Sequence, residues 1–177
     1  MKYRTLCKSL LTTCLTFLVA LSFSSCKKDN GGGGHSSRDK YLTLEVNGKP
    51  YTFNYMVNAN DKPSEKEVHF VTVGGQSSKK DTDPAFMFQL VMPGKGVQTG
   101  TYTTADSELH GVYYYQTSNG TVTYTGNGSD GSSFILNITE LSDWGVSGTF
   151  SGVLLRSETH EFMTITNGKF SAPYNGN

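Results

Sequence analysis

Apolar and polar residues alternate along most of the chain after residue 40, and this pattern constrains the fold more than any other feature of the sequence. In the stretch 41–46, Leu42, Leu44 and Val46 fall on one face of an extended chain, with polar residues on the other. Similar runs recur about every 10 to 14 residues, and no window of about 12 residues carries an apolar stripe with helical spacing. The sequence therefore predicts an all-β fold, an antiparallel β-sandwich or barrel-like meander of about nine or ten strands.

Asn-Gly pairs mark the expected chain reversals. Asn47-Gly48 and Asn119-Gly120 each lie between two alternating runs, and both residue types tolerate the positive φ angles of a two-residue hairpin turn. A third pair, Asn167-Gly168, lies inside the last predicted strand, 161–170, with few residues after it. We therefore expect a bulge or bend at the third pair rather than a hairpin.

Two stretches lead to more specific expectations. The residues from 51 to 57 alternate without interruption, which predicts one strand returning from the first hairpin. The run 85–92 is apolar at every position except Gln89, which predicts a central strand buried on both faces.

The three cysteines all lie near the start of the chain, at Cys7, Cys14 and Cys26. The segment 41–177 therefore has neither an internal disulfide nor a cysteine-based zinc site, and its stability must come from packing. Residues 1–25 combine a basic start, a short apolar run and small residues, which is the layout of a secretory signal peptide.

Residues 23–26, Phe-Ser-Ser-Cys, resemble a bacterial lipobox, in which the cysteine becomes the acylated first residue after cleavage. We expect residues 1–25 to be a lipoprotein signal peptide and Cys26 to hold the protein on a membrane through its lipid. The alternative is an ordinary cleaved signal peptide with Cys26 incidental. The charged, Gly- and Ser-rich tract 27–40 cannot build a core and is expected to be a flexible tether of roughly 20 Å, followed by a single β-domain, 41–177.

The formal net charge of zero hides an uneven distribution. Residues 41–177 hold 13 acidic and eight basic residues, a net charge of −5, whereas the tether carries +2. An acidic domain is not suited to nucleic-acid binding, and it has no electrostatic reason to lie against an anionic membrane. Attachment is therefore expected to depend mainly on Cys26.

Three short motifs carry a family resemblance: Val-Asn-Gly-Lys-Pro at 46–50, Gly-Thr-Phe-Ser-Gly at 148–152 and Thr-Asn-Gly-Lys-Phe at 166–170. Together with the start at Cys26, they resemble uncharacterised Bacteroidota lipoproteins that have a single all-β domain. The resemblance spans about 41–174. It implies an all-β fold and a location at the outer membrane, on either its surface or its periplasmic face, and it carries over no catalytic residue.

The sequence lacks the motifs that carry common catalytic and metal chemistry. His35, His69, His110 and His160 are far apart, and none has a second histidine at metal-ligand spacing. There is no Gly-x-Ser-x-Gly motif, and the loop 126–131 lacks the residues of a phosphate loop or an EF-hand. We therefore expect no metal, no cofactor and no enzymatic activity.

Aromatic residues supply the candidate ligand contacts. Tyr113, Tyr114 and Tyr115 are consecutive, so at least one must point away from the core, and Trp144 lies in a predicted turn. Exposed aromatic rings stack on sugars while nearby amides and carboxylates bind hydroxyls, although tyrosine and tryptophan also commonly cover the ends of a sandwich.

Three functional interpretations follow. The leading one is a lipid-anchored, non-enzymatic binding or structural module of the cell envelope, whose partner is a glycan or an envelope protein. The second is a carbohydrate-binding lipoprotein that uses Trp144 and one of the three tyrosines. The third is a small hydrolase with carboxylates drawn from Glu108, Glu140 and Asp143, which requires two of them to face each other about 5 to 10 Å apart.

Overall fold

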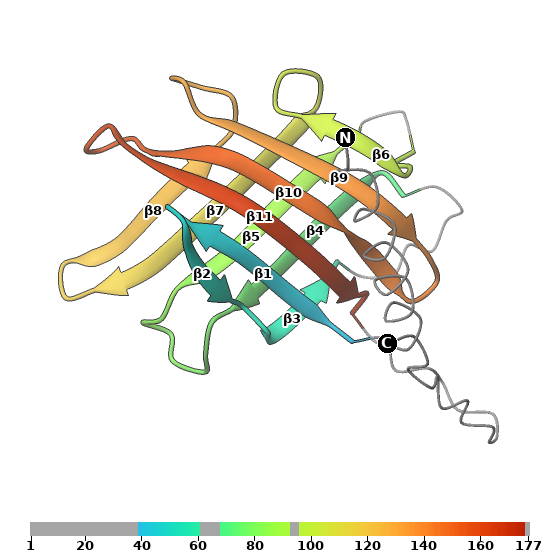
Figure 1. Ribbon diagram of the computed structural model, residues 1–177, viewed down its shortest axis with the longest axis horizontal. Helices are drawn as coiled ribbons and strands as arrows, with labels where there is room; N and C mark the ends of the chain where they lie inside the picture. Colours follow the sequence, from blue (N-terminus) through green and yellow to red (C-terminus); the bar gives the residue numbers. More distant parts are fainter. Residues whose placement is uncertain (1–38, 61–67, 93–95, 176–177) are drawn as a thin grey trace, which may run out of the picture. The chain divides into compact units, whose positions relative to one another are not determined.

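The computed structural model describes residues 39–60, 68–92 and 96–175, all within one compact unit, Ser37–Asn177. These residues form eleven strands and no helix, so the all-β prediction is confirmed (Figure 1). A helix long and apolar enough to cross a membrane is accordingly not found among them. The strands are β1 (Tyr41–Val46), β2 (Lys49–Thr52), β3 (Tyr55–Ala59), β4 (Phe70–Gln76), β5 (Ala85–Val91), β6 (Gly100–Thr103), β7 (Glu108–Thr117), β8 (Gly120–Gly126), β9 (Ser133–Leu141), β10 (Gly145–Arg156) and β11 (Glu161–Pro173).

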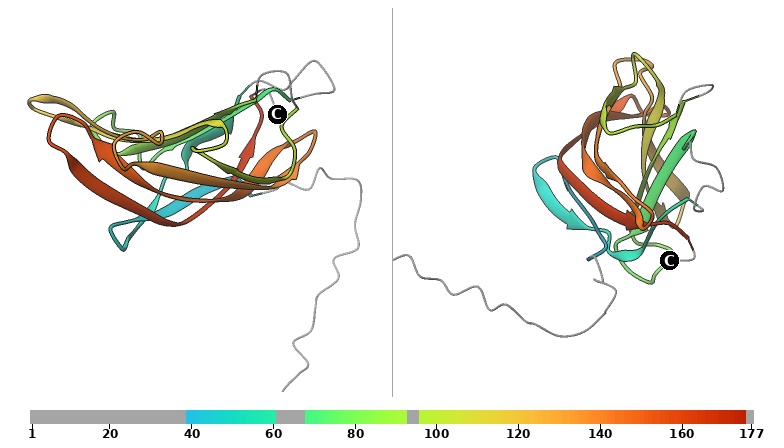
Figure 2. Two further views of the ribbon diagram at one scale, coloured as in Figure 1. Left: turned by 90° about the horizontal axis from the view of Figure 1, so that it is seen from above. Right: turned by 90° about the vertical axis from the view of Figure 1, so that its right-hand side faces the viewer.

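The strands belong to one antiparallel sheet that curls over itself without closing into a barrel. Its order is β2-β1-β11-β10-β8-β7-β5-β4-β3, with β9 beside the first part of β10 and β6 beside β9. The long strand β10 is the branch point, because it pairs with β9 over most of its length and with β8 only at Leu155. The half of the sheet that contains β1, β9, β10 and β11 therefore faces the half that contains β4, β5 and β7 (Figure 2).

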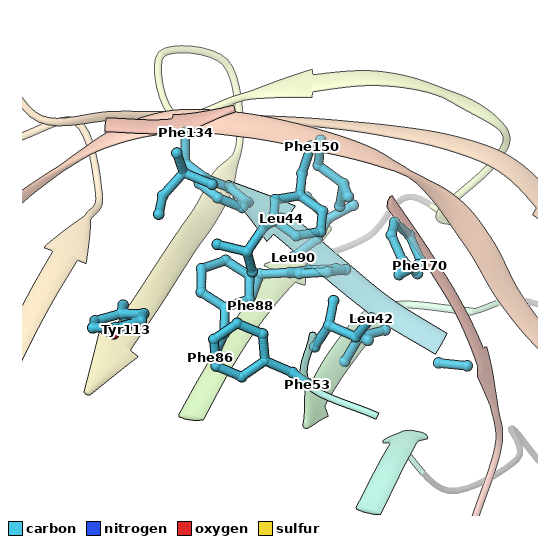
Figure 3. Close-up of a cluster of buried hydrophobic side chains, with 14 of the residues drawn as sticks. Leu42, Leu44, Phe53, Phe86, Phe88, Leu90, Tyr113, Phe134, Phe150 and Phe170 are labelled. Carbon is cyan, nitrogen blue, oxygen red and sulfur yellow. The ribbon is translucent and has the colours of Figure 1, made fainter. Parts of the chain in front are cut away.

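Phenylalanine rings fill the space between the two halves (Figure 3). Phe86 of β5 stacks on Phe150 of β10 with ring centroids 4.9 Å apart and planes within 9° of parallel. Phe88 meets Phe170 of β11 edge-on, also at 4.9 Å, and Phe134 of β9 packs against Phe150 at 5.7 Å. Offset and edge-to-face aromatic packing adds to the stabilisation from apolar burial, so this cluster is the centre of the core.

The two C-terminal sequence motifs, 148–152 and 166–170, form one packing unit. Gly148 lies opposite Phe170, and Phe150 lies opposite Gly168, so each ring covers a glycine on the neighbouring strand. A Cβ atom at Gly168 would lie 2.5 Å from two ring carbons of Phe150, closer than real Cβ atoms approach other groups. The glycines of these motifs therefore make room for the rings.

The hairpin predictions are confirmed with one change of detail. Asn47 and Gly48 have φ angles of 48° and 78°, as expected for the β1–β2 turn. The β7–β8 hairpin also forms, but its turn residues are Ser118 and Asn119, because Thr117 pairs with Gly120. Asn119 does not have a positive φ, whereas Gly120 has a φ of 118°. The glycine of this pair therefore supplies the positive φ as the first residue of β8, directly after the two turn residues.

The predicted bulge at Asn167-Gly168 is also confirmed. Phe150 pairs with Gly168 and Gly152 with Ile165, so two steps along β10 correspond to three along β11. Asn167 has a φ of 52°, in the left-handed region that asparagine tolerates better than most residues.

Two expectations about strands are wrong. The run from 51 to 57 is broken at Phe53 and Asn54, where the Asn54 side chain accepts a hydrogen bond from the Leu42 backbone N–H at 3.0 Å. The Asn54 side chain thus takes the place of a backbone acceptor for Leu42. The predicted single strand is divided into β2 and β3, which is one reason that the structure has eleven strands. The strand β5 is not buried on both faces. Its inner residues are fully buried, but Met87 and Gln89 are only half-buried, because none of the described strands forms a second layer over the outer face of β4, β5 and β7.

Candidate functional site

A cleft of about 530 Å³ lies on the outer face of β3, β4, β5 and β7, and we call it the outer cleft. Outward-pointing positions supply its surface because side chains alternate between the two faces of each strand. The outward residues that line it are Met56, Asn58, Phe70, Thr72, Gly74, Gln76, Met87 and Tyr114. Asn60 and Asn175 also contribute. Among its described lining residues there is no Asp, Glu, Lys, Arg or His.

The register of the strands explains the hollow. Asn58 of β3, Gly74 of β4 and Met87 of β5 lie side by side in one row across the sheet. Because Gly74 has no side chain, the surface is hollow at this position, between the longer side chains of Asn58 and Met87. In the next row, the small Ala85 lies between Gln76 and Tyr114.

The edge of the cleft is strained. Met56 has a φ of 56°, a conformation that costs a residue other than Gly, Asn or Asp about 1 to 3 kcal/mol. The strain coincides with a bulge, because Tyr55 pairs with Gln76 and Asn58 with Gly74, which leaves one extra residue on β3. The bulge leaves Met56 with 60% of its surface exposed. Phe70, at the end of β4 away from the bulge, is 46% exposed. Strained, exposed apolar residues of this kind are concentrated at functional sites.

One end of the cleft is fixed by backbone and amide contacts. The Asn60 side-chain oxygen accepts a hydrogen bond from the Thr72 N–H at 3.1 Å, and the Asn60 carbonyl accepts one from the Asn175 N–H at 3.2 Å. The Thr72 hydroxyl in turn accepts a hydrogen bond from the Gln89 amide at 3.2 Å. The cleft thus combines apolar walls with neutral hydrogen-bonding groups, which suits the binding of an uncharged ligand.

The three consecutive tyrosines have different surroundings. Tyr113 is only 4% exposed and meets Phe53 edge-on in the core, with ring centroids 6.3 Å apart. Burial, followed by the neighbouring tyrosines, raises its pKa to about 12. Tyr115 is on the same face and packs against the core. Tyr114 points outward and lines the outer cleft.

Trp144 lies elsewhere. It is half-buried in the loop between β9 and β10, and its carbonyl accepts a hydrogen bond from the Tyr174 N–H at 3.0 Å. It is not among the residues that line the outer cleft, although the residue after Tyr174, Asn175, is. The structure therefore brings Tyr114 to the cleft but does not place Trp144 beside it.

Among the candidate carboxylates, Glu108 lies on a different part of the sheet from Glu140 and Asp143. Glu108 is exposed at the start of β7, which pairs with β5 and β8. Glu140 near the end of β9 and the exposed Asp143 belong to the hairpin that leads into β10. Within the described ranges, no group of three or more His, Cys, Asp or Glu side chains is arranged to hold a metal ion. Cys26 and residues 27–38 of the tether lie outside the described residues.

Sequence reasoning did not identify Met56, Phe70, Gly74, Gln76 or Met87 as site residues. The sequence signal for this face is the run 85–92, whose outward positions are apolar except for Gln89 and are not covered by a second layer of described strands. A glycine inside a strand, as at Gly74, is a second signal, because it often marks a place where a ligand approaches the backbone.

A scan against protein-family models finds no family that matches the chain, and searches of the curated proteins and of the solved structures find no match either.

Proposed function

We propose that this protein is a lipid-anchored, non-enzymatic module of the cell envelope that binds an uncharged ligand in the outer cleft. The observation that carries the proposal is the cleft itself, which combines exposed apolar side chains, amides and a strained edge strand in one site, with no charged side chain among its described lining residues. An exposed apolar patch in a hollow with a few polar groups is the usual form of a binding site.

The anchor part of the proposal is based on the sequence. Cys26 follows a signal-like segment and the lipobox-like residues 23–25, and a Gly- and Ser-rich tract separates it from β1. Two or more acyl chains hold a protein stably on a bilayer, whereas one gives only marginal binding. The acidic domain then projects from the outer membrane with the cleft open to ligands.

The non-enzymatic part follows from the chemistry of the cleft lining. General acid–base catalysis normally uses His, Asp, Glu or Lys, and the described lining of the cleft has none of these. Asn58, Gln76 and Thr72 supply hydrogen bonds instead. Such groups orient a ligand without transferring its protons.

The anchor is tested by growing cells with an alkyne fatty acid and measuring the label on the protein. The wild type is expected to be labelled, and Cys26→Ala is expected to lose the label. Cys14→Ala is the matched control, because its cysteine lies inside the predicted signal peptide, and it is expected to keep the label. Equal labelling of the wild type and Cys26→Ala would refute the anchor.

Ligand binding at the cleft is tested with Gly74→Leu. A Cβ atom at Gly74 meets Met87 Cβ at an ordinary 3.4 Å, so a longer side chain enters the cleft without a backbone clash. A soluble extract of the cell envelope is expected to raise the melting temperature of the wild type and not that of Gly74→Leu, since a ligand stabilises only the state that binds it. Phe162→Ala, at an exposed aromatic outside the cleft, is the control and is expected to respond like the wild type.

A further inference from the structure

We propose, on the basis of the function proposed above, that the ligand of the outer cleft is a neutral carbohydrate that stacks on Tyr114. The first argument is that the described lining residues carry no charge. A ligand with a fixed charge loses its hydration in the cleft and finds no opposite charge on the described lining residues to replace it. This lack of compensation favours neutral ligands over acidic or sulfated glycans and over charged peptides.

The amide groups separate a sugar from a purely apolar ligand. Asn58 and Gln76 enter the cleft from neighbouring strands, and each carboxamide both donates and accepts hydrogen bonds. A sugar hydroxyl does the same, so the two match in either orientation. A lipid chain covering these amides would deprive them of hydrogen bonds to water, which costs about 1 to 3 kcal/mol for each buried group left without a partner.

The apolar side chains match the other surface of a sugar. Tyr114 and Phe70 supply aromatic rings on two strands, and the C–H face of a pyranose is apolar enough to pack on such rings. Met56 and Met87 lie in the same cleft, and their unbranched thioethers adapt to irregular shapes. The cleft therefore offers apolar side chains and hydrogen-bonding side chains in one hollow, as a pyranose ring requires.

The edge strand argues against an extended peptide. Peptides often bind by adding a strand to an exposed sheet edge, and β3 is the edge next to the cleft. Its bulge at Met56 breaks the regular spacing of backbone groups that an added strand needs. Binding must then come from side chains, which again favours a sugar.

The experiment follows the methyl signals of Met56 and Met87 by NMR in the full-length chain, labelled at methionine methyl groups. The probes are neutral gluco-, manno- and xylo-oligosaccharides, a galacturonic acid oligosaccharide and an uncharged hydrophobic peptide. At least one neutral oligosaccharide is expected to shift both methyl signals, and the acidic one is not. Shifts with the acidic oligosaccharide but with no neutral one would overturn the inference.

Variants separate stacking from folding. Tyr114→Ala is expected to weaken binding of that oligosaccharide by about tenfold or more, while Tyr114→Phe keeps the ring and most of the affinity. Phe162→Ala is expected to bind like the wild type. Circular dichroism checks that each variant is folded, and a folded Tyr114→Ala with wild-type affinity would overturn the stacking role.

The outcomes also separate this inference from the function on which it rests. If the peptide shifts the methyl signals and no neutral oligosaccharide does, the carbohydrate inference fails and the binding function of the cleft stands. If no probe shifts the methyl signals of Met56 and Met87 and the envelope extract does not raise the melting temperature, both fail.

Discussion

Gly111 on β7 provides the sharpest test of how the core is packed. A Cβ atom at this position would lie 2.6, 2.7 and 3.0 Å from three ring atoms of Phe134. The ring cannot move away easily, because Phe134 is fully buried and its neighbours Phe86, Phe88 and Phe150 have ring centroids 5.7 to 6.1 Å from its own. Gly111→Ala is therefore expected to force the ring out of its packed position.

The magnitude follows from two opposing effects. Overpacking a dense core costs about 1 to 3 kcal/mol. Replacing glycine with alanine at an ordinary φ restricts the unfolded chain and stabilises the fold by about 0.4 to 1 kcal/mol. The expected result for Gly111→Ala is a net loss of about 1.3 kcal/mol from the midpoints of these ranges, with limits of about 0 and 2.6 kcal/mol. Gly74→Ala is the matched control on β4, because its nearest contact is an ordinary 3.4 Å, and its stability is expected to equal or slightly exceed that of the wild type.

Urea denaturation followed by circular dichroism measures both variants, and the m-values show whether the unfolding reaction is the same. Phe134→Leu frees space above Gly111, so the double variant is expected to lose less stability than the sum of the two single variants. If Gly111→Ala is as stable as Gly74→Ala, or if the double variant is strictly additive, the packing of the ring on the glycine is refuted.

Three further predictions concern pH, a bulge and a turn. Folding raises the pKa of Tyr113 from 10.0 to about 12, so the folded protein keeps a proton that the unfolded chain loses above pH 10. The free energy of unfolding is therefore expected to fall by up to about 2 to 3 kcal/mol as the pH rises from about 10 to 12. Urea midpoints across this pH range measure the fall, which is expected to be smaller for Tyr113→Phe. Asn167→Val is expected to lower the free energy of unfolding by about 1 to 3 kcal/mol, because valine is strained at a φ of 52°. Asn167→Gly is not expected to lower it, so equal stability of the two variants would contradict the role of the positive φ. Asn47→Gly keeps the turn but removes the side-chain oxygen that accepts a hydrogen bond from the Thr164 N–H at 2.8 Å. The free energy of unfolding is expected to fall by about 1 kcal/mol, and hydrogen exchange of the Thr164 amide is expected to become faster. Unchanged exchange of this amide would contradict the contact.

Local alternation predicted most of the strands well, because most of them bury one face and their inward residues recur with a period of two. The inward positions of β1 and β9, for example, are all apolar. Alternation does not say what covers an outward apolar residue. Met87 was therefore interpreted as part of a doubly buried strand, whereas it lines the outer cleft.

The candidate site depends on contacts between distant parts of the chain. Consecutive residues in a strand point to opposite faces, so the sequence indicated that one of the three tyrosines points outward but not that it is Tyr114. The cleft itself requires Gly74 to lie between Asn58 and Met87, a register set by three strands together. No local pattern contains that register.

Hydroxyl-radical footprinting on intact cells tests most directly whether the outer cleft is the working surface. Oxidation of each residue in the cell-bound protein is compared with oxidation of the purified protein. An occupied cleft predicts that Met56, Phe70 and Tyr114 are protected on cells, while Phe162 and Ile135, exposed outside the cleft, are oxidised equally in both samples. Equal oxidation of the three cleft residues on cells and in the purified protein would contradict the account.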